Sequence, residues 1–230
     1  TLAGGFAAGL KPTGNKDPFA LRRNALGLAR TIIEGGLELD LPALVAVAAK
    51  SLPAGVSLDA KELEDFILDR LRGYYADQGV PGTQFDAVAD VRPASLLDFD
   101  KRLKAIAEFA RLREASSLAA ANKRIRNILR KVESPIPDAV DKAKLAEPAE
   151  QALHDALASA LADTDPMLAK RDYVGTLKRL AKLQAPVDNF FDRTMVMAED
   201  TALRDNRLAL LRGVADRFAA VAAVEQLSAS

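Results

Sequence analysis

Apolar residues recur every three or four positions through most of this chain, which is the spacing of helices that face a core. No segment shows the sustained period-two alternation of a half-buried strand, so the pattern predicts an all-α protein. The segments with helical spacing are residues 19–34, 41–52, 58–79, 85–91, 97–112, 115–132, 145–162 and 166–184, a Phe- and Met-rich segment that begins at Pro186, and a final helix from about Leu203 to the C-terminal end.

Residues typical of helix ends divide these segments. Asp17 and Pro18 suit the N-cap and first position of the helix over 19–34, and Gly35-Gly36 would end it. Asp98 is expected to cap the helix over 97–112. With a proline at position 93 as a further breaker, we expect a helical linker or body region over 1–92 and a helical bundle over 96–230.

Composition narrows the class of protein. Apolar residues are 49% of the 230 and aromatic residues only 5%, with no Trp, which favours aliphatic helices packed on helices. The chain has no Cys, which excludes disulfides, thiolate zinc sites and a Cys nucleophile. No apolar run reaches the roughly 20 residues of a membrane span, and the first residues lack the basic start of a signal peptide. Because residue 1 is Thr, we expect a fragment or a trimmed chain.

Charge is balanced overall but unevenly distributed. The 32 basic and 32 acidic residues give a net charge of zero, yet residues 93–132 hold 10 basic and 4 acidic residues. One concentrated basic block favours a localised binding patch. It argues against a protein that coats nucleic acid along its whole surface.

The centre of the basic block is the sequence ANKRIRNILRK, residues 121–131, in which five of eleven residues are Lys or Arg and none is acidic. Its apolar residues keep a helical stripe, so Lys123, Arg126, Asn127 and Arg130 fall on the opposite side. Cations neutralise phosphates, and an amide both donates and accepts hydrogen bonds, so this side suits a nucleic acid. The alternative is an ordinary solvated helix face.

Groups for catalysis are scarce. The single histidine, His154, is followed by Asp155, but consecutive helical residues point about 100° apart. The carboxylate pairs Asp98/Asp100 and Glu199-Asp200 are explained by capping of helix starts. We therefore expect no catalytic residues, no metal ligands and no cofactor-binding residues in this chain.

Five stretches resemble, in order, parts of the bacterial glycyl-tRNA synthetase beta subunit. They are LKPTGNKDPFALRRNALGLARTIIE, LLDFDKRLKAIAEF, LAAANKRIRNIL, LAEPAEQAL and PVDNFFDRTMVMAEDTALRDNRLALL. The resemblance covers about residues 6–227 and corresponds to the C-terminal part of that subunit. The last stretch holds DTALRDNRLALL, which is similar to the signature of DALR-type anticodon-binding domains.

The resemblance implies a role in a class II aminoacyl-tRNA synthetase, a cytoplasmic tetramer of two alpha and two beta subunits. The alpha subunit would form glycyl-adenylate with ATP and Mg²⁺, while this chain would bind the anticodon side of glycine tRNA and carry no complete catalytic site. The expected partners are glycine tRNA and the alpha subunit, without a membrane or DNA. The alternative function is a helical interaction module that docks the alpha subunit or other parts of the beta subunit.

The residues expected to bind tRNA are Lys123, Arg126, Asn127, Arg130 and Arg204. Unpaired anticodon bases are commonly stacked on aromatic rings or Arg planes, but aromatic residues are few here. We expect structural roles for Asn122, Arg124 and Arg207 and core positions for Phe190 and Phe191. Arg22 and Arg23 are expected to brace the two domains.

Overall fold

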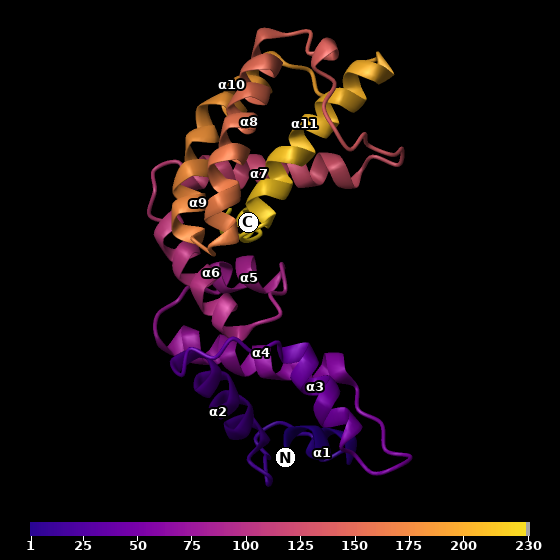
Figure 1. The fold of residues 1–230 in the computed structure, drawn as a ribbon, viewed down its shortest axis with the longest axis vertical. Coiled ribbons are helices and arrows are strands. Elements are labelled where there is room, and N and C mark those ends of the chain that lie inside the picture. Colours follow the sequence, from indigo (N-terminus) through magenta and orange to yellow (C-terminus); the bar gives the residue numbers. More distant parts are fainter. Residues whose placement is uncertain (229–230) are drawn as a thin grey trace. The chain divides into compact units, whose positions relative to one another are not determined.

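The computed structural model describes residues 1–228, and its regular structure is helical (Figure 1). The α-helices are α1 (Leu2–Ala7), α2 (Leu21–Glu34), α3 (Leu41–Lys50), α4 (Ala60–Asp77), α5 (Gly82–Ala89), α6 (Leu96–Phe109), α7 (Ala115–Arg130), α8 (Pro148–Ala169), α9 (Tyr173–Leu180), α10 (Gln184–Arg193) and α11 (Thr201–Ala219). Three short 3-10 helices are η1 (Lys142–Lys144), η2 (Ala181–Leu183) and η3 (Val224–Leu227). The described residues form no β-strand, so the all-α prediction is confirmed.

The chain forms two compact units. Unit 1 contains Thr1–Phe85 and Arg92–Lys101, and unit 2 contains Asp86–Val91 and the residues from Arg102 onward. Helices α5 and α6 therefore contribute residues to both units. The sequence-based domains, 1–92 and 96–230, remain a prediction.

In unit 1, α4 packs against α2 and α3. Its aromatic core joins Tyr75 to Phe85 and Phe99, and the last two ring centroids lie 4.9 Å apart. The Tyr75 hydroxyl donates a buried 2.7 Å hydrogen bond to Asp100 Oδ1. Burial, reinforced by this hydrogen bond to the carboxylate, raises the pKa of Tyr75 far above its ordinary value.

Two predicted helix starts were wrong in detail. Helix α2 begins at Leu21 because Ala20 adopts a left-handed conformation, with φ of 52°. Asp17 still accepts hydrogen bonds from the amides of Leu21 and Arg22, so it stabilises the helix start from outside the N-cap position. Helix α6 begins at Leu96, and Ser95 Oγ accepts from the amide of Asp98, so Asp98 lies in the first turn and does not cap it.

In unit 2, α8 packs against α9, α10 and α11, while α7 packs against α10, α11 and η3. The prediction of separate helices over 145–162 and 166–184 was wrong, because α8 continues through Pro166 to Ala169. Proline removes one helical hydrogen bond, but packing of α8 on its neighbours outweighs that cost. The chain turns instead at Arg171, with φ of 56°, and Asp172 caps α9.

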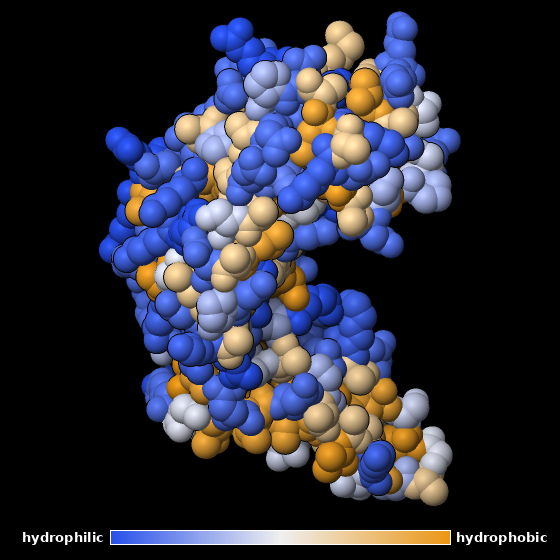
Figure 2. Space-filling view, turned by 45° about the horizontal axis from the view of Figure 1, so that its top comes forward, coloured by the Kyte–Doolittle hydropathy of each residue, from blue (hydrophilic) through white to orange (hydrophobic). Residues whose placement is uncertain are grey.

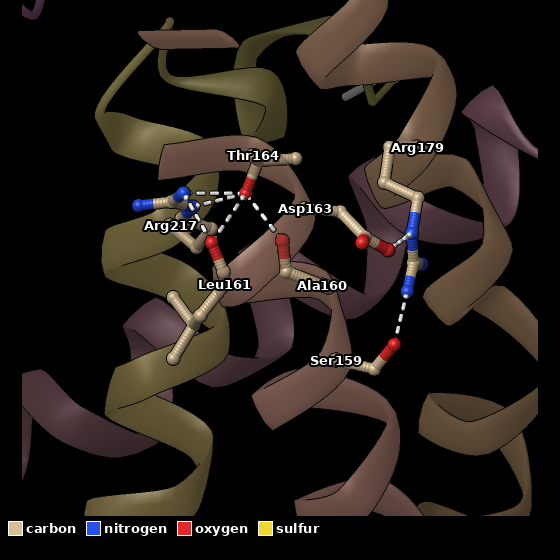
Figure 3. Close-up of polar contacts among 7 residues, drawn as sticks. All are labelled: Ser159, Ala160, Leu161, Asp163, Thr164, Arg179 and Arg217. Atoms are coloured by element: carbon tan, nitrogen blue, oxygen red, sulfur yellow. Dashed lines mark hydrogen bonds and ion pairs between the residues drawn. The ribbon is translucent and has the colours of Figure 1, made fainter. Parts of the chain in front are cut away.

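Arginines cross-link α8 to two neighbouring helices (Figure 3). From α11, Arg217 donates to Thr164 Oγ1 over 2.7 Å and to the Leu161 carbonyl over 3.1 Å. From α9, Arg179 bonds to Asp163 over 2.6 Å and to Ser159 over 2.9 Å. Arg217 also pairs with Asp165 over 2.8 Å, so both guanidinium groups have a carboxylate partner within the bundle.

Apolar surface gathers over α1 to α3 of unit 1 (Figure 2). The exposed large apolar residues of this unit are Leu10, Phe19, Leu37, Leu39, Val47 and Val56. Among the residues that the structure describes, no helix combines the length and the apolar character needed to span a membrane.

Candidate nucleic-acid interface

Helix α7 has one buried face and one exposed face. Leu118, Ala119 and Ile125 are fully buried, and Asn122 is buried beside them with its amide donating to the Leu118 carbonyl over 3.1 Å. The structural role expected for Asn122 fits this position. Lys123 and Asn127 are exposed, as the helical stripe predicts.

Arg126 has partners from two other segments of unit 2. Its Nη1 lies 3.4 Å from Asp216 of α11, and its Nε lies 3.6 Å from Glu225 of η3. Its Nη2 also donates to the Ala215 carbonyl over 3.1 Å. This half-buried guanidinium therefore fixes α7 to α11 and η3 and has little charge left for a ligand.

The other cations of the exposed face are less constrained. Arg130 is exposed and donates to Asn127 Oδ1 over 2.6 Å, within the same helix. The side chains of Lys123 and Lys131 form no hydrogen bond or ion pair with any of residues 1–228. Their ammonium groups are therefore available to an anionic ligand.

A first hollow of about 360 Å³ lies along this exposed face. It is lined by Ala120, Lys123, Arg124, Asn127, Ile128, Lys131 and Ser228, and we call it the cationic hollow. Three of its side chains carry positive charge and none carries negative charge. This arrangement suits phosphate and sugar groups.

A second hollow of about 420 Å³ shares Ala120 and Arg124 with the first. Its other lining residues are Ser117, Ala121, Asp188, Phe191 and Asp192, and we call it the aromatic hollow. The guanidinium carbon of Arg124 lies 4.1 Å from the centre of the Phe191 ring, which is a cation–π contact. Asp188 accepts hydrogen bonds from Ser117 over 3.1 Å and from Gln184 over 2.6 Å, so its carboxylate is held in place.

The two arginines of the DALR-like stretch occupy different environments. Arg207 is buried and pairs with the buried Glu150 of α8, as expected, and it also donates to the Met195 carbonyl over 2.8 Å. Arg204 is half-buried, and its Nε lies 3.3 Å from the neighbouring Asp205. Neither arginine lines the two hollows.

The structure brings Lys123 and Asn127 together with Lys131 and Ser228, which were not among the predicted site residues. Phe190 is fully buried as expected, but the core position expected for Phe191 was wrong, because this half-buried ring lines the aromatic hollow. Phe191 lies one residue beyond the apolar stripe that contains Val187 and Phe190. This spacing could have indicated that its side chain points away from the core. Nothing in the sequence indicated that Ser228 lies against α7.

Residues 1–228 contain no group of three or more His, Cys, Asp or Glu side chains placed to hold a metal ion. His154 bonds to its neighbour Asp155, with 3.0 Å between Nδ1 and Oδ1.

Comparison with known proteins shows the family to which the chain is related. Residues 1–90 match the family model of the glycyl-tRNA synthetase beta subunit, and residues 118–224 match that of the DALR anticodon binding domain. A glycine–tRNA ligase beta subunit from Xanthomonas campestris pv. campestris is 61% identical over 99% of this chain. The chain belongs to the glycyl-tRNA synthetase beta subunit family. Similar beta subunits come from Xylella fastidiosa, with 49% identity over 99% of the chain, and Pseudomonas aeruginosa, with 46% over 99%.

This member of the beta subunit family spans only part of its relatives' length. It covers 34% of the Xanthomonas protein, 36% of the Xylella protein and 34% of the Pseudomonas protein. The α7 surface and both hollows lie almost wholly within the DALR match, with Ser117 and Ser228 just outside it.

Proposed function

We propose that this chain binds the anticodon loop of glycine tRNA through the exposed face of α7, as part of a glycyl-tRNA synthetase beta subunit. One observation carries the proposal. Within the segment that matches a DALR anticodon binding domain, Lys123 and Lys131 line one hollow, and neither has a partner among residues 1–228. Asn127 lies in the same hollow and supplies an amide for hydrogen bonding.

The proposed roles of the predicted residues follow from their contacts. Lys123 and Arg130 contact the RNA backbone, and Asn127 contacts a sugar or a base edge. Arg126 holds α7 in place through Asp216, Glu225 and Ala215, and it acts on the RNA mainly by fixing the surface. Arg204 supplies a weaker field because Asp205 neutralises it locally.

The activity of the complete enzyme is part of the proposal. We propose that the beta subunit assembles with an alpha subunit in the cytoplasm, and that the assembly joins glycine to its tRNA with ATP and Mg²⁺ bound at the alpha subunit. No residue of this chain is proposed to bind ATP or metal. The chain's contribution is to hold the tRNA.

Charge reversal on α7 tests this function. We expect Lys123→Glu with Lys131→Glu, in the full-length beta subunit assembled with the alpha subunit, to weaken glycine tRNA binding by about 10-fold or more, because each reversal replaces attraction to a phosphate with repulsion. The measurement is a filter-binding titration at constant low salt. The matched control is Lys178→Glu with Lys182→Glu, since both lysines are exposed, lie outside the two hollows and have no partner in the described part of the chain.

The rival function is docking of a protein partner by the same cationic face. If the α7 reversal leaves tRNA affinity unchanged and instead lowers the yield of the assembled enzyme in size-exclusion chromatography, the rival is supported and the tRNA proposal is wrong. Equal loss of affinity in the α7 variant and the control would show that only overall charge matters.

A further inference from the structure

The aromatic hollow differs from the cationic hollow in the chemistry it offers. Asp188 and Asp192 line it, and carboxylates repel the phosphates that the cationic hollow attracts. The aromatic hollow therefore disfavours the RNA backbone. Its Phe191 ring and the Arg124 guanidinium instead offer flat surfaces of the kind on which unpaired bases stack.

The two hollows are neighbours, because Arg124 and Ala120 line both. A single-stranded nucleotide joins a charged backbone to a flat base, so one nucleotide can place its phosphate in one hollow and its base in the other. Asp188 then offers hydrogen-bond acceptors to the base. Ser117 and Gln184 hold that carboxylate in a fixed orientation, which sequence discrimination requires.

We propose that the aromatic hollow is a binding site for one unpaired cytosine of the anticodon, stacked on the Arg124–Phe191 pair with its amino group donating to Asp188. This assignment rests on the proposed function. All glycine codons begin with two guanines, so a glycine anticodon presents two neighbouring cytosines. A carboxylate accepts from the amino group of cytosine but faces the carbonyl oxygen that uracil carries at the same position.

The probes are glycine tRNA and two copies of it, each with one of these cytosines changed to uracil, bound to the full-length assembled enzyme. We expect the wild-type protein to bind one of the changed tRNAs about 10-fold or more weakly. Asp188→Asn should reduce that discrimination to about 2-fold or less, because an amide can donate to the uracil carbonyl. Full discrimination by the Asp188→Asn variant would overturn the assignment.

Asp192→Asn is the matched control, since Asp192 lies on the same helix, lines the same hollow and undergoes the same loss of charge. It should keep the discrimination of the wild type. If Asp192→Asn removes discrimination and Asp188→Asn does not, the acceptor has been assigned to the wrong carboxylate and the proposal fails as stated.

Stacking is tested by two further variants. Phe191→Leu keeps an apolar side chain but removes the ring, and Arg124→Lys keeps the charge but removes the flat guanidinium. Each should weaken binding of the unmodified tRNA by about 5-fold or more, and unchanged hydrogen exchange of α10 would show that the fold is intact. Wild-type affinity in both variants would overturn the stacking site.

These outcomes separate this proposal from the one on which it rests. If the reversal at Lys123 and Lys131 weakens all three tRNAs equally while Asp188→Asn and Phe191→Leu change nothing, the function stands and the cytosine site is wrong. If glycine tRNA does not bind the wild-type enzyme through this surface at all, both proposals fail.

Discussion

At the scale of single residues, the charged side chains of unit 2 either form ion pairs within the fold or remain exposed. Arg207 is the clearest example of a side chain paired within the fold. It is 7% exposed and pairs with Glu150, which is 1% exposed. Glu150 also accepts the backbone amides of Ala146 and Glu147, over 2.6 and 2.9 Å. One carboxylate thus links α11 to the start of α8.

Removal of Arg207 should therefore destabilise this junction strongly. We expect Arg207→Met to lower the free energy of opening of α8 and α11 by about 3–5 kcal/mol, because it leaves a buried carboxylate without its cation. Hydrogen exchange of the amides in both helices measures the effect in the full-length protein. Adding Glu150→Gln should restore part of the loss, and a double variant less stable than Arg207→Met would contradict this account.

The sequence predicted some of these residue roles and missed others. The stripe on α7 predicted which residues are exposed, including Lys123 and Asn127, because helical spacing fixes direction. It did not show that Arg126 would pair with Asp216 and Glu225, which lie about ninety or more residues later. Partners that are distant in sequence depend on tertiary packing, which local spacing does not encode.

At the scale of helices, the ends depend on individual side chains. Asp200, within the DALR-like stretch, caps α11 by accepting the amides of Ala202 over 2.8 Å and Leu203 over 3.1 Å. This capping role was expected from the sequence and is confirmed. The role of Asp200 in the DALR-like stretch is thus to start a helix, and contact with RNA is not needed to explain it.

Loss of this cap should lower the stability of α11 and leave tRNA binding unchanged. We expect Asp200→Ala to lower the stability of the first turn of α11 by about 1 kcal/mol. Hydrogen exchange in that turn and tRNA titration measure the two effects separately. Asp200→Asn should retain most of the stability, because Asn is an equally good N-cap. A large loss of tRNA affinity in the Asn variant would show that the carboxylate contacts the ligand.

The positions of the helices were easier to predict from the sequence than the residues at which they begin and end. The pattern located each long helix because apolar spacing persists over several turns. The start of α2 was misplaced because a left-handed Ala20 delays it, and α8 was cut short because Pro166 is a strong breaker in isolation. In both places backbone geometry and tertiary packing override local propensity.

At the scale of the whole molecule, the net charge is zero, although the exposed face of α7 is cationic. Lys123, Arg124 and Lys131 surround one hollow, whereas most other arginines of the bundle pair internally. Binding of RNA should therefore depend on salt, but far less steeply than for a uniformly basic protein. The hollows themselves were not predictable, because α7, α10 and Ser228 come from separate parts of the chain.

We expect the logarithm of tRNA affinity to fall with the logarithm of salt concentration, with a contribution of about −1.4 from Lys123 and Lys131, since each single-strand phosphate contact adds about −0.7. Lys123→Gln should make the measured slope shallower by about 0.7. Titrations of both proteins over a range of salt concentrations measure this change. An unchanged slope would mean that Lys123 does not neutralise a phosphate.

The anchoring of α7 by Arg126 has a thermodynamic consequence. Three contacts to α11 and η3 hold the helix, so it presents the same face before any ligand arrives. Binding then requires little ordering of the protein backbone, and the conformational entropy to be lost lies mostly in the RNA loop and in the lysine side chains. The recognition surface is preorganised, so most of the entropic cost of binding lies in the anticodon loop, which must unstack its bases.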